Sequence, residues 1–153
     1  MKIIYGIDCG ATGGIAKLDG SKVELFSFRD HTIQDMLALF DLVFSQPGEK
    51  FALVERVHAM PSTFRGTSTS WALAENFAIV RTLLAANHVA HDLVLPEKWQ
   101  RELGCRFGKK VKYDLRKKLL RSKAQSLFPR VKEISKDVAD ALLIAYYARK
   151  VYK

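Results

Sequence analysis

The sequence has little of what builds a disulfide-stabilised, zinc-binding or membrane-spanning protein. It contains two cysteines in 153 residues, Cys9 and Cys105, and no CxxC or Cys/His zinc spacing, which favours a reducing compartment. Its uncharged stretches fall well short of the roughly 18–20 residues that a transmembrane helix needs, so we expect no membrane partner. The first residues lack a signal-peptide core, and we therefore expect a cytoplasmic protein.

Negative charge is also scarce. The chain has 25 lysines and arginines against 16 acids, a net charge of +9, which points first to nucleic acid and second to an anionic membrane. Residues 98–132 alone hold 13 basic and two acidic residues, a net +11, whereas the remainder holds 12 and 14. This segment could be a solvated helical face, but the size of the asymmetry and its interleaved aromatic residues favour contact with phosphates.

Hydrophobic periodicity and turn signals predict the element order βββαβαβααα. An antiparallel meander that leads into βαβ segments predicts an α/β fold, a mixed five-stranded sheet flanked by helices, in one domain over residues 1–153. We expect strands at 3–9, 15–18, 23–28, 51–57 and 90–95, and helices at 33–45, 68–87, 96–103, 113–127 and 135–152.

Four acidic residues interrupt apolar elements. Asp8 and Glu55 each follow a run of apolar strand residues, and Asp137 and Asp140 lie in the last expected helix. An isolated buried carboxylate is costly and has to be paired or bound to metal. Because Asp137 and Asp140 are three residues apart, we expect both to face one side of their helix.

Each acid also has a plain structural explanation. Asp8 could cap the glycine-rich turn that follows, Glu55 could pair with Arg56 or a basic loop residue, and Asp137 suits the first turn of a helix. Together, however, acids beside a strongly basic segment would repel a polyanion unless divalent cations intervened. Two Mg²⁺ ions about 3.5–4 Å apart, held by carboxylates, would do so in a two-metal nuclease, and Mg²⁺ prefers such oxygen ligands.

Three segments in this order resemble the RuvC-type Holliday-junction resolvases, which have the RNase H-like fold. They are IDCG at residues 7–10, VE at 54–55 and DVADALLIA at 137–145, and the last is the most specific. The resemblance covers nearly the whole chain. The segment ERVHAMP at residues 55–61 is similar to phage members of the group.

The resemblance implies catalytic and metal-binding roles for Asp8, Glu55, Asp137 and Asp140, with two Mg²⁺ ions per active site and Mn²⁺ as a substitute. Asp8 would bridge both ions, and Asp137 occupies a position where some relatives have a different ligand type. The family acts as a homodimer that resolves four-way junctions by paired nicks, and other branched junctions stay open as substrates. The implied setting is recombination and repair in the cytoplasm, at the nucleoid or in the host cytoplasm if the protein is viral.

The resemblance also suggests residues that contact DNA. Phe64 lies in the loop after the fourth strand, from which aromatic side chains of relatives probe the junction centre, and Arg65 beside it could contact phosphate. We expect the densest basic cluster to lie near the acids and to neutralise phosphates. That cluster comprises Lys109, Lys110, Lys112, Lys117 and Lys118.

Other functions stay open at this point. An RNase H-like enzyme could cut RNA–DNA hybrids, and a non-catalytic scaffold could keep the fold for binding nucleic acid. The glycine-rich turn at residues 8–14 also looks like the phosphate-binding turn of the actin, Hsp70 and sugar-kinase superfamily. Those ATPases need a second similar half that 153 residues do not supply. We interpret Trp99 as a packing residue and expect Trp71 to face the core or a partner.

Overall fold

The computed structural model describes residues 2–57, 67–108 and 110–152, which form five strands and five helices in the expected order. The strands are β1 (Ile3–Asp8), β2 (Gly14–Asp19), β3 (Lys22–Ser27), β4 (Lys50–Glu55) and β5 (Ala90–Val94). The helices are α1 (Ile33–Phe44), α2 (Thr67–Ala86), α3 (Pro96–Glu102), α4 (Tyr113–Leu127) and α5 (Lys136–Val151).

The strands form one mixed five-stranded sheet, as the sequence predicts, and their order in it is β3-β2-β1-β4-β5. β1, β2 and β3 pair antiparallel, with Ile7 opposite Ile15, whereas β1, β4 and β5 pair parallel, with Ile7 opposite Val54. Parallel strands end at the same edge of a sheet. The residues at the ends of β1 and β4, Asp8 and Glu55, therefore lie at that edge together.

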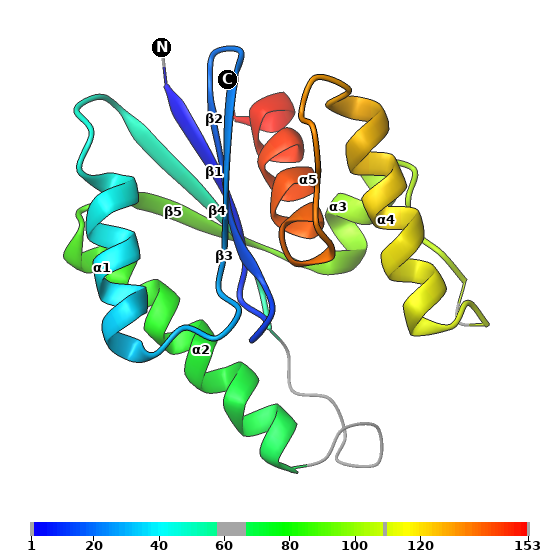
Figure 1. Ribbon diagram of the computed structural model, residues 1–153, viewed down its shortest axis with the longest axis horizontal. Coiled ribbons are helices and arrows are strands. Elements are labelled where there is room, and N and C mark those ends of the chain that lie inside the picture. The colour runs from blue at the N-terminus through cyan, green and yellow to red at the C-terminus, as the bar shows by residue number, and fades with distance from the viewer. Residues whose placement is uncertain (1, 58–66, 109, 153) are drawn as a thin grey trace.

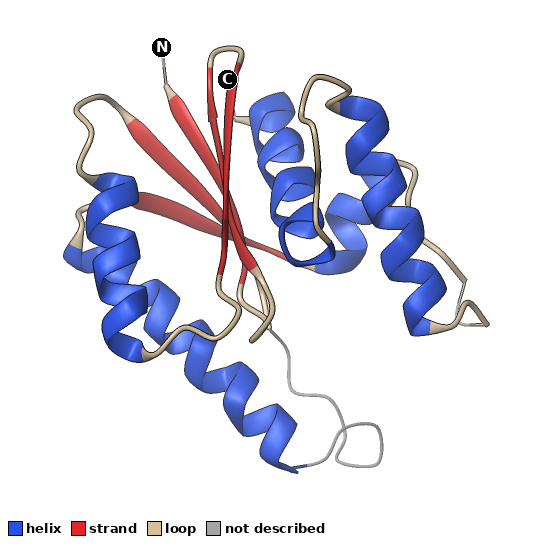
Figure 2. Ribbon diagram, viewed as in Figure 1, coloured by secondary structure: helices blue, strands red, loops and turns tan. Residues whose placement is uncertain are grey.

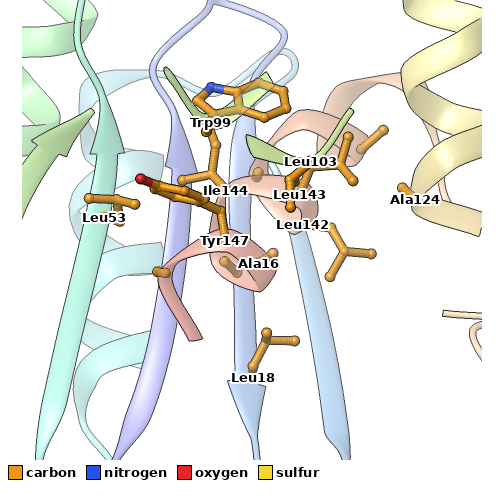
Figure 3. Close-up of a cluster of buried hydrophobic side chains, with 14 of the residues drawn as sticks. Ala16, Leu18, Leu53, Trp99, Leu103, Ala124, Leu142, Leu143, Ile144 and Tyr147 are labelled. Atoms are coloured by element: carbon orange, nitrogen blue, oxygen red, sulfur yellow. The ribbon is translucent and has the colours of Figure 1, made fainter. Parts of the chain in front are cut away.

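Helices cover both faces of the sheet (Figures 1 and 2). α1 and α2 lie on one face, where Phe40, Leu84 and the sheet residue Tyr5 belong to one buried cluster. α5 packs on the other face with α3 and α4 outside it, and its middle is almost entirely buried. Figure 3 shows this second cluster, in which the fully buried Trp99 of α3 lies with Ile144 and other α5 side chains.

A glycine in β1 allows α5 to lie against the sheet. A Cβ atom at Gly6 would sit 2.2 Å from both the carbonyl oxygen of Ala141 and the amide nitrogen of Ala145, far inside van der Waals contact. Because the colliding atoms are helix backbone, no rotamer change could relieve the clash. This close approach holds the N-terminal end of α5, with its two aspartates, beside the end of β1 (Figure 1).

The observed ends of the elements differ from the expected ones by one or two residues. β4 ends at Glu55 and not at Val57, because Val94, the last residue of β5, is opposite Glu55 and leaves no partner strand beyond it. α1 begins with a capping box, in which the Thr32 hydroxyl accepts from the Asp35 amide and the Asp35 carboxylate accepts from Thr32. Within the described ranges, no helix is long and apolar enough to cross a membrane.

Candidate active site

Asp8 ends β1 at the first turn of the glycine-rich loop. Its Oδ1 accepts a hydrogen bond of 3.0 Å from the backbone amide of Gly10. Asp8 therefore caps the glycine-rich turn, which was the structural alternative to a metal-binding role. One carboxylate oxygen is used in this way, and the side chain remains partly exposed. Capping therefore fixes the carboxylate at the edge of the sheet without satisfying all of its acceptor capacity.

Glu55 ends β4, next to β1, and is held by a residue 44 positions further along the chain. The indole Nε1 of Trp99 donates a 2.8 Å hydrogen bond to Glu55 Oε2. Trp99 is fully buried, so its ring packs in the core while its N–H reaches the carboxylate. The expectation that Trp99 is a packing residue is confirmed, and the structure adds this polar contact. Arg56 is exposed.

Asp140 lies one turn into α5 and is buried. The ammonium of Lys117, on α4, donates to Asp140 Oδ2 and forms an ion pair with it. The other oxygen, Oδ1, is buried and has no hydrogen-bond partner among the described residues. A buried carboxylate oxygen without a partner is uncommon in folded proteins and calls for a ligand.

Asp8, Glu55 and Asp140 form what we call the acidic site, because their charges act on one another. Burial raises the pKa of Glu55 to about 8, and the negative charges of Asp8 and Asp140 add to the rise. Burial also raises the pKa of Asp140 to about 6, although Lys117 opposes this and Asp8 adds to it. Elevated pKa values of this kind indicate crowded carboxylates that lack sufficient positive charge.

Asp137 has different partners from the acidic site. Arg29, which follows β3, donates from Nε and Nη2 to its two oxygens at 2.8 Å each, and the Ser27 hydroxyl donates at 3.1 Å. The Arg29 guanidinium holds the pKa of Asp137 below its usual value. Although Asp137 and Asp140 lie one turn apart, the first is bonded to the β3 side and the second to α4. The metal-binding role of Asp137 stays a prediction.

The acidic site suits a divalent cation in its chemistry more than in its present arrangement. Carboxylate oxygens are the ligands that Mg²⁺ prefers, and the buried, unpartnered Oδ1 of Asp140 is available to one. Across residues 2–57, 67–108 and 110–152, no three His, Cys, Asp or Glu side chains are already arranged to hold a metal ion. The Lys117 ammonium supplies positive charge there instead. A cation would therefore bind with a local shift of these side chains.

The expected DNA-binding residues fall into three groups. Phe64, Arg65 and Lys109 lie outside the described residues. Lys110, Lys112 and Lys118 are exposed near the start of α4, where they could meet phosphates. Lys117 differs from them, because only 22% of its side chain is exposed and it points to Asp140. Lys117 therefore belongs to the acidic site as well as to the basic cluster.

Sequence reasoning missed the partners of the acids. Arg29 and Ser27 carried no motif, and Trp99 was assigned to packing alone. Its place at the start of a short helix that follows a parallel strand was the one available signal. In parallel sheets, such positions lie at the edge where the strand ends and ligands bind.

The fold and the acids at its edge define an RNase H-like α/β protein, with carboxylates from two neighbouring parallel strands and from the helix packed across them. The comparison with solved structures is consistent with this. RuvC of Thermus thermophilus in complex with a Holliday junction substrate matches with a TM-score of 0.70 and 15% identity, over 99% of this chain and 97% of that chain.

A second RuvC structure from Thermus thermophilus matches with a TM-score of 0.58 and 15% identity, over 97% of this chain and 95% of that chain. No protein-family model matches the sequence, and no curated protein matches it either. At this identity the likeness shows the fold, which is that of RuvC along nearly the entire chain. The resemblance seen in the sequence motifs is thereby confirmed for the fold.

Proposed function

We propose that the protein is a divalent-metal-dependent, structure-selective DNA endonuclease that resolves four-way junctions by paired nicks. The observation that carries the proposal is the acidic site: three mutually interacting carboxylates, two at strand ends and one on α5, in a fold like that of RuvC. Beside them lies the start of α4, with exposed Lys110, Lys112 and Lys118. Metal-assisted hydrolysis of a phosphodiester needs carboxylates that bind the cations and basic side chains that bind the phosphates, and this surface has both.

The residues of this chain divide the work between them. Asp8, Glu55 and Asp140 would hold the ions, with Asp8 fixed by the Gly10 amide and Glu55 by the Trp99 indole. Bound Mg²⁺ supplies positive charge that offsets the acids and the phosphate, and it lowers the pKa of coordinated water. The exposed lysines bind the flanking backbone, which places a phosphodiester at the sheet edge without reading its sequence.

A homodimer is part of the proposal, because two sites are needed to nick two strands of one junction. Trp71 of α2 is 75% exposed, so the expectation that it faces the core is wrong and the alternative, a partner, remains. The N-terminal part of α2 extends past the sheet (Figure 1). An exposed tryptophan on a projecting helix is typical of an interface residue. The roles in DNA recombination and repair and the cytoplasmic location that we expect from the sequence also depend on this proposed function.

The test is cleavage of labelled four-way junctions, a linear duplex of the same sequence and an RNA–DNA hybrid, each with Mg²⁺, Mn²⁺ or chelator. We expect paired nicks in the junction with either metal and none with chelator. Asp8→Asn should abolish cutting but leave junction binding in place, since it removes a cation ligand and no phosphate contact. Equal cutting of linear duplex would refute junction selectivity.

Two alternatives give different results in the same assay. A hybrid nuclease would degrade the RNA–DNA duplex faster than the junction. A non-catalytic scaffold would bind the junction but cut nothing, and Asp8→Asn would change neither result. The crowding of three carboxylates, one of them with a buried oxygen that has no partner among the described residues, favours the catalytic proposal over the scaffold, because a binding module gains nothing from buried acids next to DNA.

A further inference from the structure

Lys117 stands apart from the other residues of the basic segment, because its ammonium sits among the acids. It pairs with Asp140 Oδ2, and only 22% of its side chain is exposed. The ion pair with Asp140 therefore places a positive charge in the acidic site.

The position of this ammonium conflicts with a cation on Asp140. Lys117 takes one oxygen of Asp140, and the other, Oδ1, is buried with no hydrogen-bond partner in the part of the chain that the structure describes. A divalent cation on Asp140 would stand within a few ångströms of the ammonium. Like charges so close repel one another strongly in a partly buried site, where solvent screens them less than in bulk water. The cation and the ammonium therefore compete for the same carboxylate.

The Lys117 ammonium could rotate away from Asp140 toward the exposed lysines near the start of α4. It lies in the second turn of α4, with its Nζ 5.9 Å from the ring centre of Tyr113, which is largely exposed. The next residue, Lys118, is exposed on the same helix, as are Lys110 and Lys112 just before it. A lysine side chain is a flexible four-carbon stem, so its ammonium can change direction without moving the helix. By rotating outward, the ammonium would join the basic cluster at its border with the acidic site.

We propose that Lys117 is an exchangeable counter-ion, which neutralises the acidic site without metal and moves to a DNA phosphate when a divalent cation takes Asp140. This deepens the proposed nuclease function and rests on it. Metal binding and DNA binding would then assist each other through one side chain: the cation releases an ammonium for the phosphate, and the phosphate holds that ammonium away from the cation. Such coupling is reciprocal by thermodynamic necessity.

The first test measures metal affinity and stability without any reaction. Calorimetric titration with Ca²⁺ at pH 8.5 compares the wild type with Lys117→Met and with Lys118→Met, a matched change of charge at an exposed neighbour. We expect Lys117→Met to bind Ca²⁺ at least about tenfold more tightly, because its competitor is gone. It should also melt at a lower temperature than the wild type in chelator and recover most of that loss in saturating Ca²⁺. Lys118→Met should resemble the wild type in both measurements.

The second test measures junction binding as a function of salt. In Ca²⁺, the slope of log affinity against log salt should be shallower for Lys117→Met than for the wild type by about 0.9, the value of one phosphate contact. In chelator the two slopes should agree. For Lys118→Met, any loss of slope should be the same in both media.

Three results would overturn the proposal. They are unchanged or weaker Ca²⁺ binding by Lys117→Met, a loss of stability that Ca²⁺ does not reduce, and salt slopes that differ equally with and without Ca²⁺. The last two would mark Lys117 as a fixed structural ion pair or a constant DNA contact. None of these measurements requires cutting, so failure to cleave a junction would refute the proposed function separately.

Discussion

Replacing Gly6 with alanine tests how the fold builds the site. The new Cβ would lie 2.2 Å from Ala141 O and Ala145 N and 2.8 Å from Ala145 Cα. Restoring ordinary contact needs a displacement of α5 from β1 of about 1 Å, and overpacking of a tight core costs about 1–3 kcal/mol. Because the obstacle is backbone, we expect about 3 kcal/mol, partly offset by the roughly 0.5 kcal/mol that Gly→Ala stabilises through the unfolded chain.

The assay is urea and thermal unfolding in chelator, with Gly108→Ala as the control, since nothing lies within 4 Å of a Cβ at that position. At roughly 2–4 °C per kcal/mol for a chain of this size, Gly6→Ala should melt about 5–10 °C below the wild type. It should also bind Ca²⁺ more weakly, because α5 carries Asp140 away from Asp8. A Gly6→Ala protein as stable as the Gly108→Ala control would refute the packing argument.

Three further predictions concern single interactions at or near the site. Trp99→Phe removes the indole donor to Glu55 and part of a fully buried ring, and should cost at least about 1–3 kcal/mol in urea unfolding; no measurable loss would mean that neither contributes to stability. Arg29→Lys replaces two parallel hydrogen bonds to Asp137 with one point charge, yet should leave the urea midpoint almost unchanged because the Arg29 side chain is more than half exposed; a clear fall in the midpoint would contradict this. Without metal, the protein should lose stability as the pH rises through the pKa of Glu55 at about 8, and more gently through that of Asp140 at about 6, because a raised pKa means that the folded chain binds the proton more tightly than the unfolded chain. Urea midpoints in chelator check this trend, and a profile that climbs between about pH 6 and about pH 8 would disprove it.

The sequence was sufficient for the sheet, because each strand and helix has its own local pattern. The sequence predicts that the sheet is mixed, and the structure adds that β1 pairs parallel with β4, which brings Asp8 and Glu55 to one edge. Helix spacing placed Asp137 and Asp140 one turn apart. These inferences rest on periodicity and connection rules, which act over short stretches of chain.

The partners of the acids could not be obtained in this way. Trp99 reaches Glu55 over 44 positions, and Arg29 reaches Asp137 over 108, so each contact depends on how α3 and β3 pack in three dimensions. The i,i+3 rule placed two aspartates on neighbouring parts of α5, but their different partners follow from the elements on either side of that helix. Lys117 is the clearest case: its sequence context indicates a surface lysine, and only the packing of α4 on α5 directs it to Asp140.

The central claim is that Asp8, Glu55 and Asp140 jointly bind divalent cations. Crystals grown with Mn²⁺ and measured near its absorption edge would locate the ions directly. We predict anomalous peaks among the carboxylate oxygens of Asp8, Glu55 and Asp140, with the Lys117 ammonium moved off Asp140. Well-ordered crystals at saturating Mn²⁺ that hold the ion elsewhere, or that keep Lys117 on Asp140 with no peak between the acids, would contradict it.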